Sequence, residues 1–230
     1  MTYLLFTNLT DEKNDSFFVE ARHCFSEEFV TKFEKYKRWQ DAKSTILGRL
    51  LLAYGLKNLY QIDIDDLKMN FTKDKKPFIE NSAIKFNISH SNDVIVCAIT
   101  SVGEVGVDVE KINDVNIQDF KGQFSQVEYD AIINSSNELQ QFYTYWTQKE
   151  AVVKCYGSGL NIPLDSFEII DNVTLVDKQR YYVKESILGA AYKCHTATNT
   201  YLSDDKMEII KIGSSNLSDF MSLYNFRSFK

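Results

Sequence analysis

The segment Gly106-Val107-Asp108-Val109-Glu110 alternates valines with carboxylates, and this alternation constrains the fold more than any other feature. A side-chain period of two is typical of a β-strand, where successive side chains point to opposite faces of the sheet. The valines then share one face, and Asp108 and Glu110 share the other. We therefore expect a strand that buries one face in a core and presents two carboxylates on the opposite face.

A second segment, from Trp146 to Lys154, has the composition of a helix and leads to a glycine-rich break at Gly157 and Gly159. Glu150 and Lys154 are four positions apart, so they lie on one helical face. Together with the two strand carboxylates, they would place three acids and a lysine on two rigid elements. That set is suited to Mg²⁺-assisted phosphate chemistry, because Mg²⁺ prefers carboxylate, phosphate and water oxygens.

Simpler interpretations exist for the same residues. Asp108 and Glu110 suit the solvated face of an edge strand, and Glu150 with Lys154 suits a surface ion pair that contributes only about 0.2–0.5 kcal/mol. The coincidence of two acids on a glycine-entered strand with a third acid on the helix favours a site.

Composition limits the class of protein. The chain has 230 residues, 44% of them hydrophobic, and a net charge of −6, which is typical of a globular protein without a basic surface for nucleic acid. Residues 1–7 have the pattern of a strand rather than a targeting signal, and no run of about 18 apolar residues predicts a membrane span. The four cysteines form no CxxC pair, which favours reduced thiols. We expect a cytoplasmic protein.

Periodicity predicts helices and strands in both halves of the chain. Ser125 and Glu128 have the spacing of a capping box that opens a helix. Elsewhere the pattern predicts a strand at 1–7, helices at 26–38, 39–60 and 140–156, and strands at 69–71, 85–88, 94–100, 167–170, 180–184 and 190–196. This mixture indicates an α+β architecture.

Similar tetrapeptides, Trp39-Gln40-Asp41-Ala42 and Trp146 to Lys149, fall at comparable places in the two halves. We therefore predict two pseudo-symmetric α+β halves packed side by side, with an N-terminal half at 1–103 and a C-terminal half at 104–230. Because the duplication supplies both halves within one chain, we expect a monomer.

Several further motifs occur in a fixed order between about residues 75 and 167. They are Phe86-Asn87-Ile88-Ser89-His90-Ser91, Gly106 to Ile112, Phe124 to Glu128, Trp146 to Lys154, Gly157-Ser158-Gly159-Leu160 and Leu164 to Phe167. In sequence, order and spacing they resemble the motifs of the 4′-phosphopantetheinyl transferases of the surfactin-synthetase-activating (Sfp) type.

This resemblance implies an enzyme that moves the phosphopantetheine arm of coenzyme A onto a serine of an apo acyl, peptidyl or aryl carrier protein, releasing adenosine 3′,5′-bisphosphate. It implies a Mg²⁺ site, also suited to Mn²⁺, made by Asp108, Glu110 and Glu150, with Asp108 facing coenzyme A as well. Lys154 is implied to contact the pyrophosphate and to stabilise the departing bisphosphate. The implied fold holds coenzyme A and the metal ion in a cleft between the halves.

Glu128 has two interpretations that the sequence leaves open. It is placed to act as the general base on the serine hydroxyl, directly or through water. The capping box alone also explains a Glu three residues after Ser125. Lys149 faces about 100° away from Glu150 around the helix, so we expect it to orient the motif or to contact Glu128. We expect Trp146 to pack in the core.

The resemblance also implies a set of coenzyme A contacts from the first half. Ser89 and His90 are implied to lie against coenzyme A, with His90 meeting its phosphates. The short Lys76-Pro77 segment is implied to line the nucleotide pocket. A basic cluster near residues 32–38 suits either the 3′-phosphate or a solvated helix face, and the weaker candidates for nucleotide contact are Lys32, Lys35 and Thr45.

Three other functions compete with transfer. A non-catalytic coenzyme A-binding or carrier-binding protein would have no need of the complete set of acids and lysine. A Mg²⁺-dependent pyrophosphohydrolase would use the same residues with water as nucleophile. A serine hydrolase built on His90 and Ser91 lacks a GxSxG nucleophile elbow. Under the transfer hypothesis, the segment from Val115 to Phe124 is a candidate carrier-docking surface.

Overall fold

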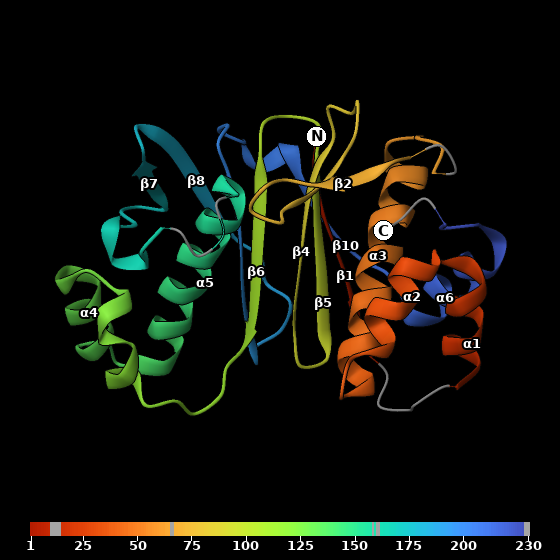
Figure 1. Cartoon of the computed structure of the whole chain (residues 1–230). Helices are drawn as coiled ribbons and strands as arrows, with labels where there is room; N and C mark the ends of the chain where they lie inside the picture. Colours follow the sequence, from red (N-terminus) through yellow and green to blue (C-terminus); the bar gives the residue numbers. More distant parts are fainter. Residues whose placement is uncertain (10–14, 65–66, 158, 160–161, 228–230) are drawn as a thin grey trace.

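In the computed structural model, two four-stranded sheets stand side by side with helices on their outer faces (Figure 1). The structure describes residues 1–9, 15–64, 67–157, 159 and 162–227. Of the motif at 157–160, Ser158 and Leu160 lie outside these described residues. The mixture of sheets and helices confirms the predicted α+β class.

The first sheet has the strand order β10-β1-β5-β4. In it β1 pairs antiparallel with β5, β5 antiparallel with β4, and β10 parallel with β1. The strands are β1 (Thr2–Asn8), β4 (Lys85–Ser91), β5 (Val94–Thr100) and β10 (Met207–Lys211). Every residue of β5 is buried, as the apolar run from Val94 to Ile99 predicts for a central strand.

Helices cover the outer face of this sheet. They are α1 (Asp15–Cys24), α2 (Glu27–Glu34), α3 (Trp39–Leu59) and α6 (Ser214–Leu223). Ser26 caps α2, since its hydroxyl accepts a hydrogen bond from the backbone nitrogen of Phe29. On the predicted apolar face of α3, Ile46 and Leu50 are fully buried in the core that α3 shares with β5, whereas Tyr54 is partly buried at its edge.

The second sheet has the order β6-β9-β8-β7 and is antiparallel throughout. Its strands are β6 (Val105–Lys111), β7 (Val173–Val176), β8 (Gln179–Glu185) and β9 (Tyr192–Thr198). Beside it are α4 (Gln126–Ile133), α5 (Glu138–Tyr156) and the 3₁₀ turns η1 (Ile117–Gln123), η3 (Leu164–Ser166) and η4 (Asp204–Lys206).

The predicted strand at 167–170 is wrong. The 3₁₀ turn η3 precedes it, and Ile170 makes only an isolated bridge with Val173. Asp171 and Asn172 follow with positive φ angles of 49° and 62°, so the chain turns back before the first strand of the region begins at Val173.

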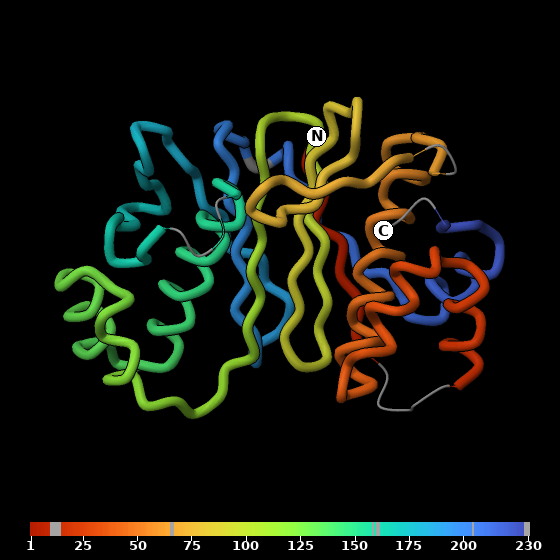
Figure 2. The backbone as a smooth tube through the Cα atoms, viewed as in Figure 1, coloured from red at the N-terminus to blue at the C-terminus, as the bar shows by residue number. Residues whose placement is uncertain are grey.

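The two sheets meet where β4 and β6 run beside each other, and we call this line of contact the seam (Figure 1). Valines of β6, including Val107, pack against Val96 and Leu4 of the first sheet in a core between the sheets. A small hairpin of β2 (Met69–Phe71) and β3 (Pro77–Ile79) crosses in front of the seam (Figure 2).

Two elements near the C-terminus, β10 and α6, belong to the part of the molecule that is built on the first sheet. Strand β10 extends the first sheet, and α6 packs into the core formed with α1 and α3. The division of the chain at 103/104 and its pseudo-symmetry stay predictions. None of the described helices has the length and hydropathy needed to cross a bilayer.

Candidate active site

The site forms around Asp108, at the centre of the seam. Lys154 on α5 places its ammonium nitrogen 2.5 Å from Asp108 Oδ1 and 3.0 Å from Ser89 Oγ. Ser89 on β4 donates a hydrogen bond of 3.1 Å to the same Asp108 oxygen. The structure therefore brings together one predicted residue from each of three elements, β4, β6 and α5.

Gly106 explains how α5 comes so near to β6. A Cβ atom at this position would lie 2.2 Å from the carbonyl oxygen of Ala151 and 2.2 Å from the amide nitrogen of Cys155. The glycine therefore lets the backbones of the strand and the helix meet directly. This close approach brings Lys154 within reach of Asp108.

The Asp108 carboxylate is nearly enclosed, with only 3% of the residue exposed. Burial raises the pKa of this carboxyl, and the charge and hydrogen bond of Lys154 oppose the rise. Its second oxygen, Oδ2, is buried and has no hydrogen-bond partner among the described residues. A buried anionic oxygen without a partner is unfavourable, so it marks a place where a cation or donor is needed.

Glu110 and Glu150 stand around Asp108. Both are half-buried, and Ser91 donates a hydrogen bond of 2.7 Å to Glu110 Oε2. Burial is the main cause that raises the pKa of each of these carboxyls, and the charge of Asp108 raises both further. Asp108 thus disfavours the ionised forms of Glu110 and Glu150, as expected of neighbouring like charges, and the Lys154 ammonium partly opposes this effect.

These carboxylates fit a hard divalent cation by their chemistry. Mg²⁺ binds oxygen ligands, and Asp108, Glu110 and Glu150 supply them around one unpartnered oxygen. Within the described residues, no three His, Cys, Asp or Glu side chains are already gathered closely enough to hold a metal ion. In this arrangement the positive charge beside Asp108 is that of Lys154.

Strand β4 contributes more to the site than the sequence predicted. Alternate residues of this strand, Asn87, Ser89 and Ser91, each form a hydrogen bond with β6. Asn87 Oδ1 accepts from the backbone nitrogen of Val107 at 2.9 Å, and the hydroxyls of Ser89 and Ser91 donate to Asp108 and Glu110. Asn87 and Ser91 were not among the predicted site residues. Their spacing of two positions from Ser89 could have identified them as site residues, because it places all three side chains on one face of a strand.

His90 points away from this row, in keeping with the alternation of the strand, and is exposed. Partial desolvation lowers the pKa of its imidazole. The Asp41 carboxylate on α3 raises it, and the Lys154 ammonium lowers it. His90 is therefore within electrostatic range of both the first helix turn of α3 and the Lys154 group.

Glu128 lies in a different environment from the other acids. Its carboxylate accepts hydrogen bonds from the backbone nitrogens of Ser125 at 3.0 Å and Ile169 at 2.9 Å, and Lys149 Nζ lies 2.8 Å away. Only 2% of the residue is exposed. The capping box with Ser125 is confirmed, and both carboxylate oxygens are already engaged in contacts within the protein.

Lys149 is fully buried and completes this arrangement. Besides Glu128, its ammonium donates to the carbonyl oxygens of Leu164 at 2.7 Å and Phe167 at 2.6 Å. Burial lowers the pKa of Lys149, and Glu128 opposes the change. The predicted contact with Glu128 is confirmed, and the pair joins α4, α5 and the turn η3.

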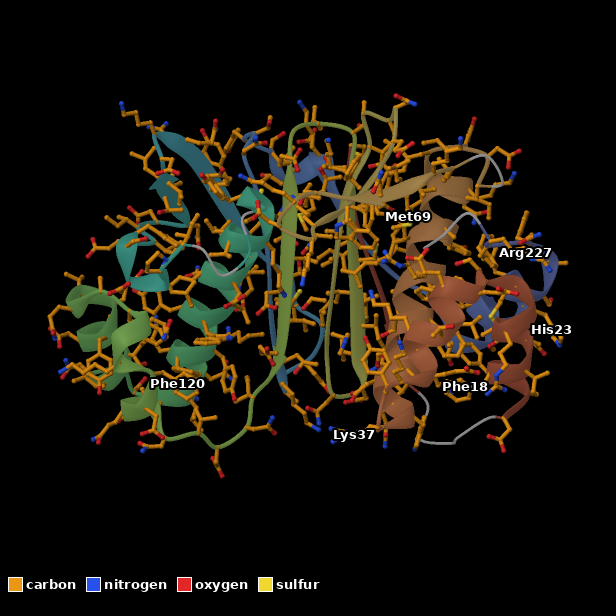
Figure 3. All side chains as sticks on the ribbon, in the orientation of Figure 1. Phe18, His23, Lys37, Met69, Phe120 and Arg227 are labelled. Atoms are coloured by element: carbon orange, nitrogen blue, oxygen red, sulfur yellow. The ribbon has the colours of Figure 1, made fainter. Side chains whose placement is uncertain are left out.

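A cavity of about 440 Å³ opens beside Glu150. Trp146 and Phe120 form part of its wall, and Phe120 lies on the α4 side of the molecule (Figure 3). The ring of Trp146 packs 5.4 Å from Phe120 and 5.9 Å from Phe142, measured between centroids, which confirms its predicted packing role. The cavity gives a ligand access to Glu150 from the side of η1.

The remaining predicted contacts lie in the first half, apart from the acids. Lys32 on α2 is exposed and sits 5.7 Å from the ring centroid of Phe71, and Lys35 is exposed at the end of the same helix. Thr45 donates its hydroxyl proton to the carbonyl oxygen of Asp41. Lys76 and Pro77 belong to the hairpin in front of the seam. In the described part of the chain, no hydrogen bond or ion pair links these five to Asp108.

Comparison with known proteins agrees with this arrangement. A family model described as the 4′-phosphopantetheinyl transferase superfamily matches residues 104–208, and one described as 4′-phosphopantetheinyl transferase, N-terminal, matches residues 12–102. The chain is 29% identical over 220 residues to 4′-phosphopantetheinyl transferase gsp of Aneurinibacillus migulanus, covering 92% of each protein.

A second relative is 4′-phosphopantetheinyl transferase Sfp of Bacillus subtilis, 32% identical over 164 residues that cover 70% of this chain and 71% of that protein. The L-aminoadipate-semialdehyde dehydrogenase-phosphopantetheinyl transferase of Xenopus laevis is 30% identical over 161 residues, 63% of this chain and 53% of the relative. With both halves matched and the seam assembled from the corresponding motifs, the chain belongs to the 4′-phosphopantetheinyl transferase superfamily and is of the Sfp type.

Proposed function

We propose that Asp108, Glu110, Glu150 and Lys154 form the active site at which this transferase moves the 4′-phosphopantetheine group of coenzyme A to a serine of an apo carrier protein. The observation that carries this assignment is the buried Asp108 carboxylate. One of its oxygens is held by Lys154 and Ser89, and the other is buried without a partner among the described residues.

In the proposed reaction, the serine oxygen attacks the phosphorus that bears pantetheine. A new P–O bond forms to the serine, and the bond from that phosphorus to the bridging oxygen of the diphosphate breaks. Adenosine 3′,5′-bisphosphate leaves with the electron pair. Lys154 would stabilise the negative charge that grows on this leaving group, since its ammonium lies beside Asp108 in the same site.

The serine proton needs an acceptor, and we assign this role to Glu150 in place of Glu128. Glu150 is half-exposed and lines the cavity next to the seam, whereas both oxygens of Glu128 are engaged and buried. A general base must come within hydrogen-bond reach of the proton that it accepts.

Asp108, Glu110 and Glu150 are the residues that we expect to hold Mg²⁺, with Mn²⁺ as the alternative ion. When bound, the ion would neutralise charge on the diphosphate oxygens. The residues of the first half then serve the rest of coenzyme A: Ser89 and His90 face its phosphates, and the nucleotide is held by Lys32, Lys35, Thr45, Pro77 and the hairpin that includes Lys76.

The segment from Val115 to Phe124 stays our candidate for carrier docking. It contains η1, and Phe120 and Gln123 from it line the cavity beside Glu150. A bulky charge at the exposed position 123, in Gln123→Arg, should raise the KM for the carrier and leave the KM for coenzyme A unchanged. An unchanged carrier KM would remove this segment from the interface.

We further propose that the protein works as a cytoplasmic monomer. All four cysteines are free thiols, three of them buried, which suits a reducing compartment. Sedimentation at concentrations above and below the assay range would reveal a self-associating enzyme and so contradict the monomer.

Intact-mass spectrometry of an apo carrier protein tests the function. The carrier is incubated with this protein, coenzyme A and Mg²⁺, in parallel with samples that contain EDTA or the Glu150→Gln variant. Glu138→Gln is the matched control, because Glu138 lies on the same helix but is exposed in its first turn. We expect a mass gain of one phosphopantetheine group with wild type and Glu138→Gln, and none in the other two samples.

The same experiment separates the competing functions. Coenzyme A that is cleaved without carrier modification would identify a pyrophosphohydrolase. Intact coenzyme A and unmodified carriers of several types would favour a binding protein, in which Glu150→Gln should barely change carrier affinity.

A further inference from the structure

Lys76 joins the two halves of the molecule through a side chain whose ammonium bonds to Glu104 and to backbone carbonyl groups of the second half. It lies at the turn of the β2–β3 hairpin, which leaves the first half near Met69 and passes in front of the seam (Figure 3). Its ammonium nitrogen is 3.0 Å from Glu104 Oε2 and 3.0 Å from the carbonyl oxygen of Cys155 in the last turn of α5. Only 12% of its side chain is exposed.

The contact with Cys155 stabilises the end of the helix that carries Lys154. The last carbonyl groups of a helix lack partners within it, and a cation near them is favourable. Cys155 directly follows Lys154, and the amide nitrogen of Gly157 closes the turn on Val153. Lys76 thus supplies both a donor and a positive charge at this end of α5.

Gly157 makes room for this contact. Its φ angle is 87°, in the left-handed region that ends many helices, and a Cβ atom there would lie 2.9 Å from Lys76 Cδ. The glycine therefore serves both the helix end and the approach of the lysine side chain.

The hairpin turn presents Lys76 in a defined position. The backbone nitrogen of Thr72 donates to the carbonyl oxygen of Lys76 at 2.9 Å, and the Thr72 hydroxyl accepts from the backbone nitrogen of Lys76 at 3.1 Å. At the same turn Lys75 adopts a positive φ of 65°. The carboxylate of Glu104 is itself held by Lys85 of β4 at 3.4 Å.

We propose that Lys76 is a positioning residue that couples the nucleotide-binding hairpin to the last turn of α5 and so holds Lys154 against Asp108. Its ammonium is engaged by protein acceptors, so it acts on the reaction through α5 and not as a phosphate ligand. This inference rests on the proposed function for its kinetic consequence, but its structural part is independent of activity.

The kinetic test compares Lys76→Met with Lys73→Met, an exposed lysine of the same turn that undergoes the same change of charge. Loss of a charge-assisted hydrogen bond should lower kcat of Lys76→Met by about 10- to 100-fold, with little change in the carrier KM. Lys76→Arg should recover part of the loss. Glu104→Gln should also lower kcat, because it frees Lys76 from one of its two main acceptors.

The penalty should be equal with coenzyme A and with 3′-dephospho-coenzyme A. A penalty that shrinks with the dephospho substrate, or a Glu104→Gln variant that is as active as wild type, would make Lys76 a direct ligand and overturn the proposal. Equal kcat values for Lys76→Met and wild type would overturn it as well.

Hydrogen exchange tests the structural part without an assay. In Lys76→Met the amides of residues 153–157 should exchange faster than in wild type, and in Lys73→Met they should not. Unchanged exchange in Lys76→Met would refute the coupling even in an active enzyme. Failure of wild type to modify any carrier would instead refute the proposed function, while the exchange result would still decide the coupling.

Discussion

Lys154 Nζ lies 2.5 Å from Asp108 Oδ1, although the two residues are 46 positions apart and belong to different elements. The pair exists because the helix packs directly on the strand at Gly106. Ser89, from the neighbouring sheet, shares the same Asp108 oxygen. One carboxylate oxygen is thus the point at which both sheets and α5 meet.

Asp108→Asn should abolish the chemistry of this site while leaving the fold intact. Asparagine keeps the shape of the side chain and relieves the burial of a charge, but it removes the negative charge that holds Lys154 and serves a metal ion. We expect a loss of about 100-fold or more in the rate of carrier modification. Initial rates across a Mg²⁺ titration, with circular dichroism to monitor the fold, measure this.

Asp130→Asn provides the control, since Asp130 is an exposed acid on α4 outside the site. It should retain the wild-type rate. A folded Asp108→Asn enzyme with the wild-type rate would show that Asp108 has no part in the reaction.

Glu128→Gln separates the two interpretations of Glu128. If the residue is a buried structural partner of Lys149, the substitution leaves an unpaired ammonium in the core and should destabilise the protein by about 3–5 kcal/mol. The kcat measured at a temperature where the variant is folded should stay near that of wild type. Urea denaturation and initial-rate measurements on the same preparation give both quantities.

Replacing both partners, as Glu128→Gln with Lys149→Met, should destabilise less than the sum of the single changes, because no unpaired charge remains. If Glu128 is instead the general base, the single variant will lose its activity even at a temperature where it is folded.

Local features of this chain were predictable because their partners are near in sequence. Ser125 and Glu128 are three positions apart, and the capping box depends on little else. The strand Val94–Thr100 is apolar up to its last residue, and this pattern favours a central position in a sheet. The alternation of valines with carboxylates around Asp108 likewise predicts β6 without reference to its neighbouring strands.

The contacts that were missed depend on the relative placement of distant elements. Strand β10 pairs with β1 at the other end of the chain, and its sequence of only five residues contains no sign of that partner. The acceptor of Lys76 is a backbone carbonyl 79 positions away, at Cys155, which no side-chain pattern reveals. The row of contacts from β4 to β6 depends in the same way on how two separate sheets are aligned.

His195 should make the stability of the protein depend on pH. It is buried on β9, and Thr147 Oγ1, which donates to the carbonyl oxygen of Tyr143, lies 2.7 Å from its Nδ1. Because the hydroxyl proton goes to Tyr143, the Thr147 oxygen is free to accept a hydrogen bond from an Nδ1–H of His195. Burial lowers the pKa of His195 from 6.5 to about 4.

Because the folded state resists protonation of His195 and the unfolded state does not, this contribution to stability is complete above pH 6.5 and is lost as the pH falls toward 4. The loss should reach about 3 kcal/mol over that interval. Urea denaturation of wild type and His195→Gln at several pH values between 7.5 and 5 measures it. His23→Gln, at an exposed histidine of α1, is the control and should follow wild type; equal slopes for wild type and His195→Gln would contradict the assignment.

Gly106→Ala should separate the helix from the strand and thereby reduce both stability and activity. The added Cβ would meet the backbone of α5 at Ala151 and Cys155, which cannot yield as a flexible side chain does. Overpacking of this kind destabilises proteins by about 1–3 kcal/mol. The shift of α5 should also move Lys154 away from Asp108, so kcat should fall more than the KM for coenzyme A rises.

Gly122→Ala is the matched control for stability, because a Cβ at Gly122 in η1 would meet no atom within 4 Å. Its unfolding free energy should match that of wild type, whereas that of Gly106→Ala should be lower. If Gly106→Ala is as stable and as active as wild type, the direct contact between α5 and β6 is not what aligns Lys154 with Asp108.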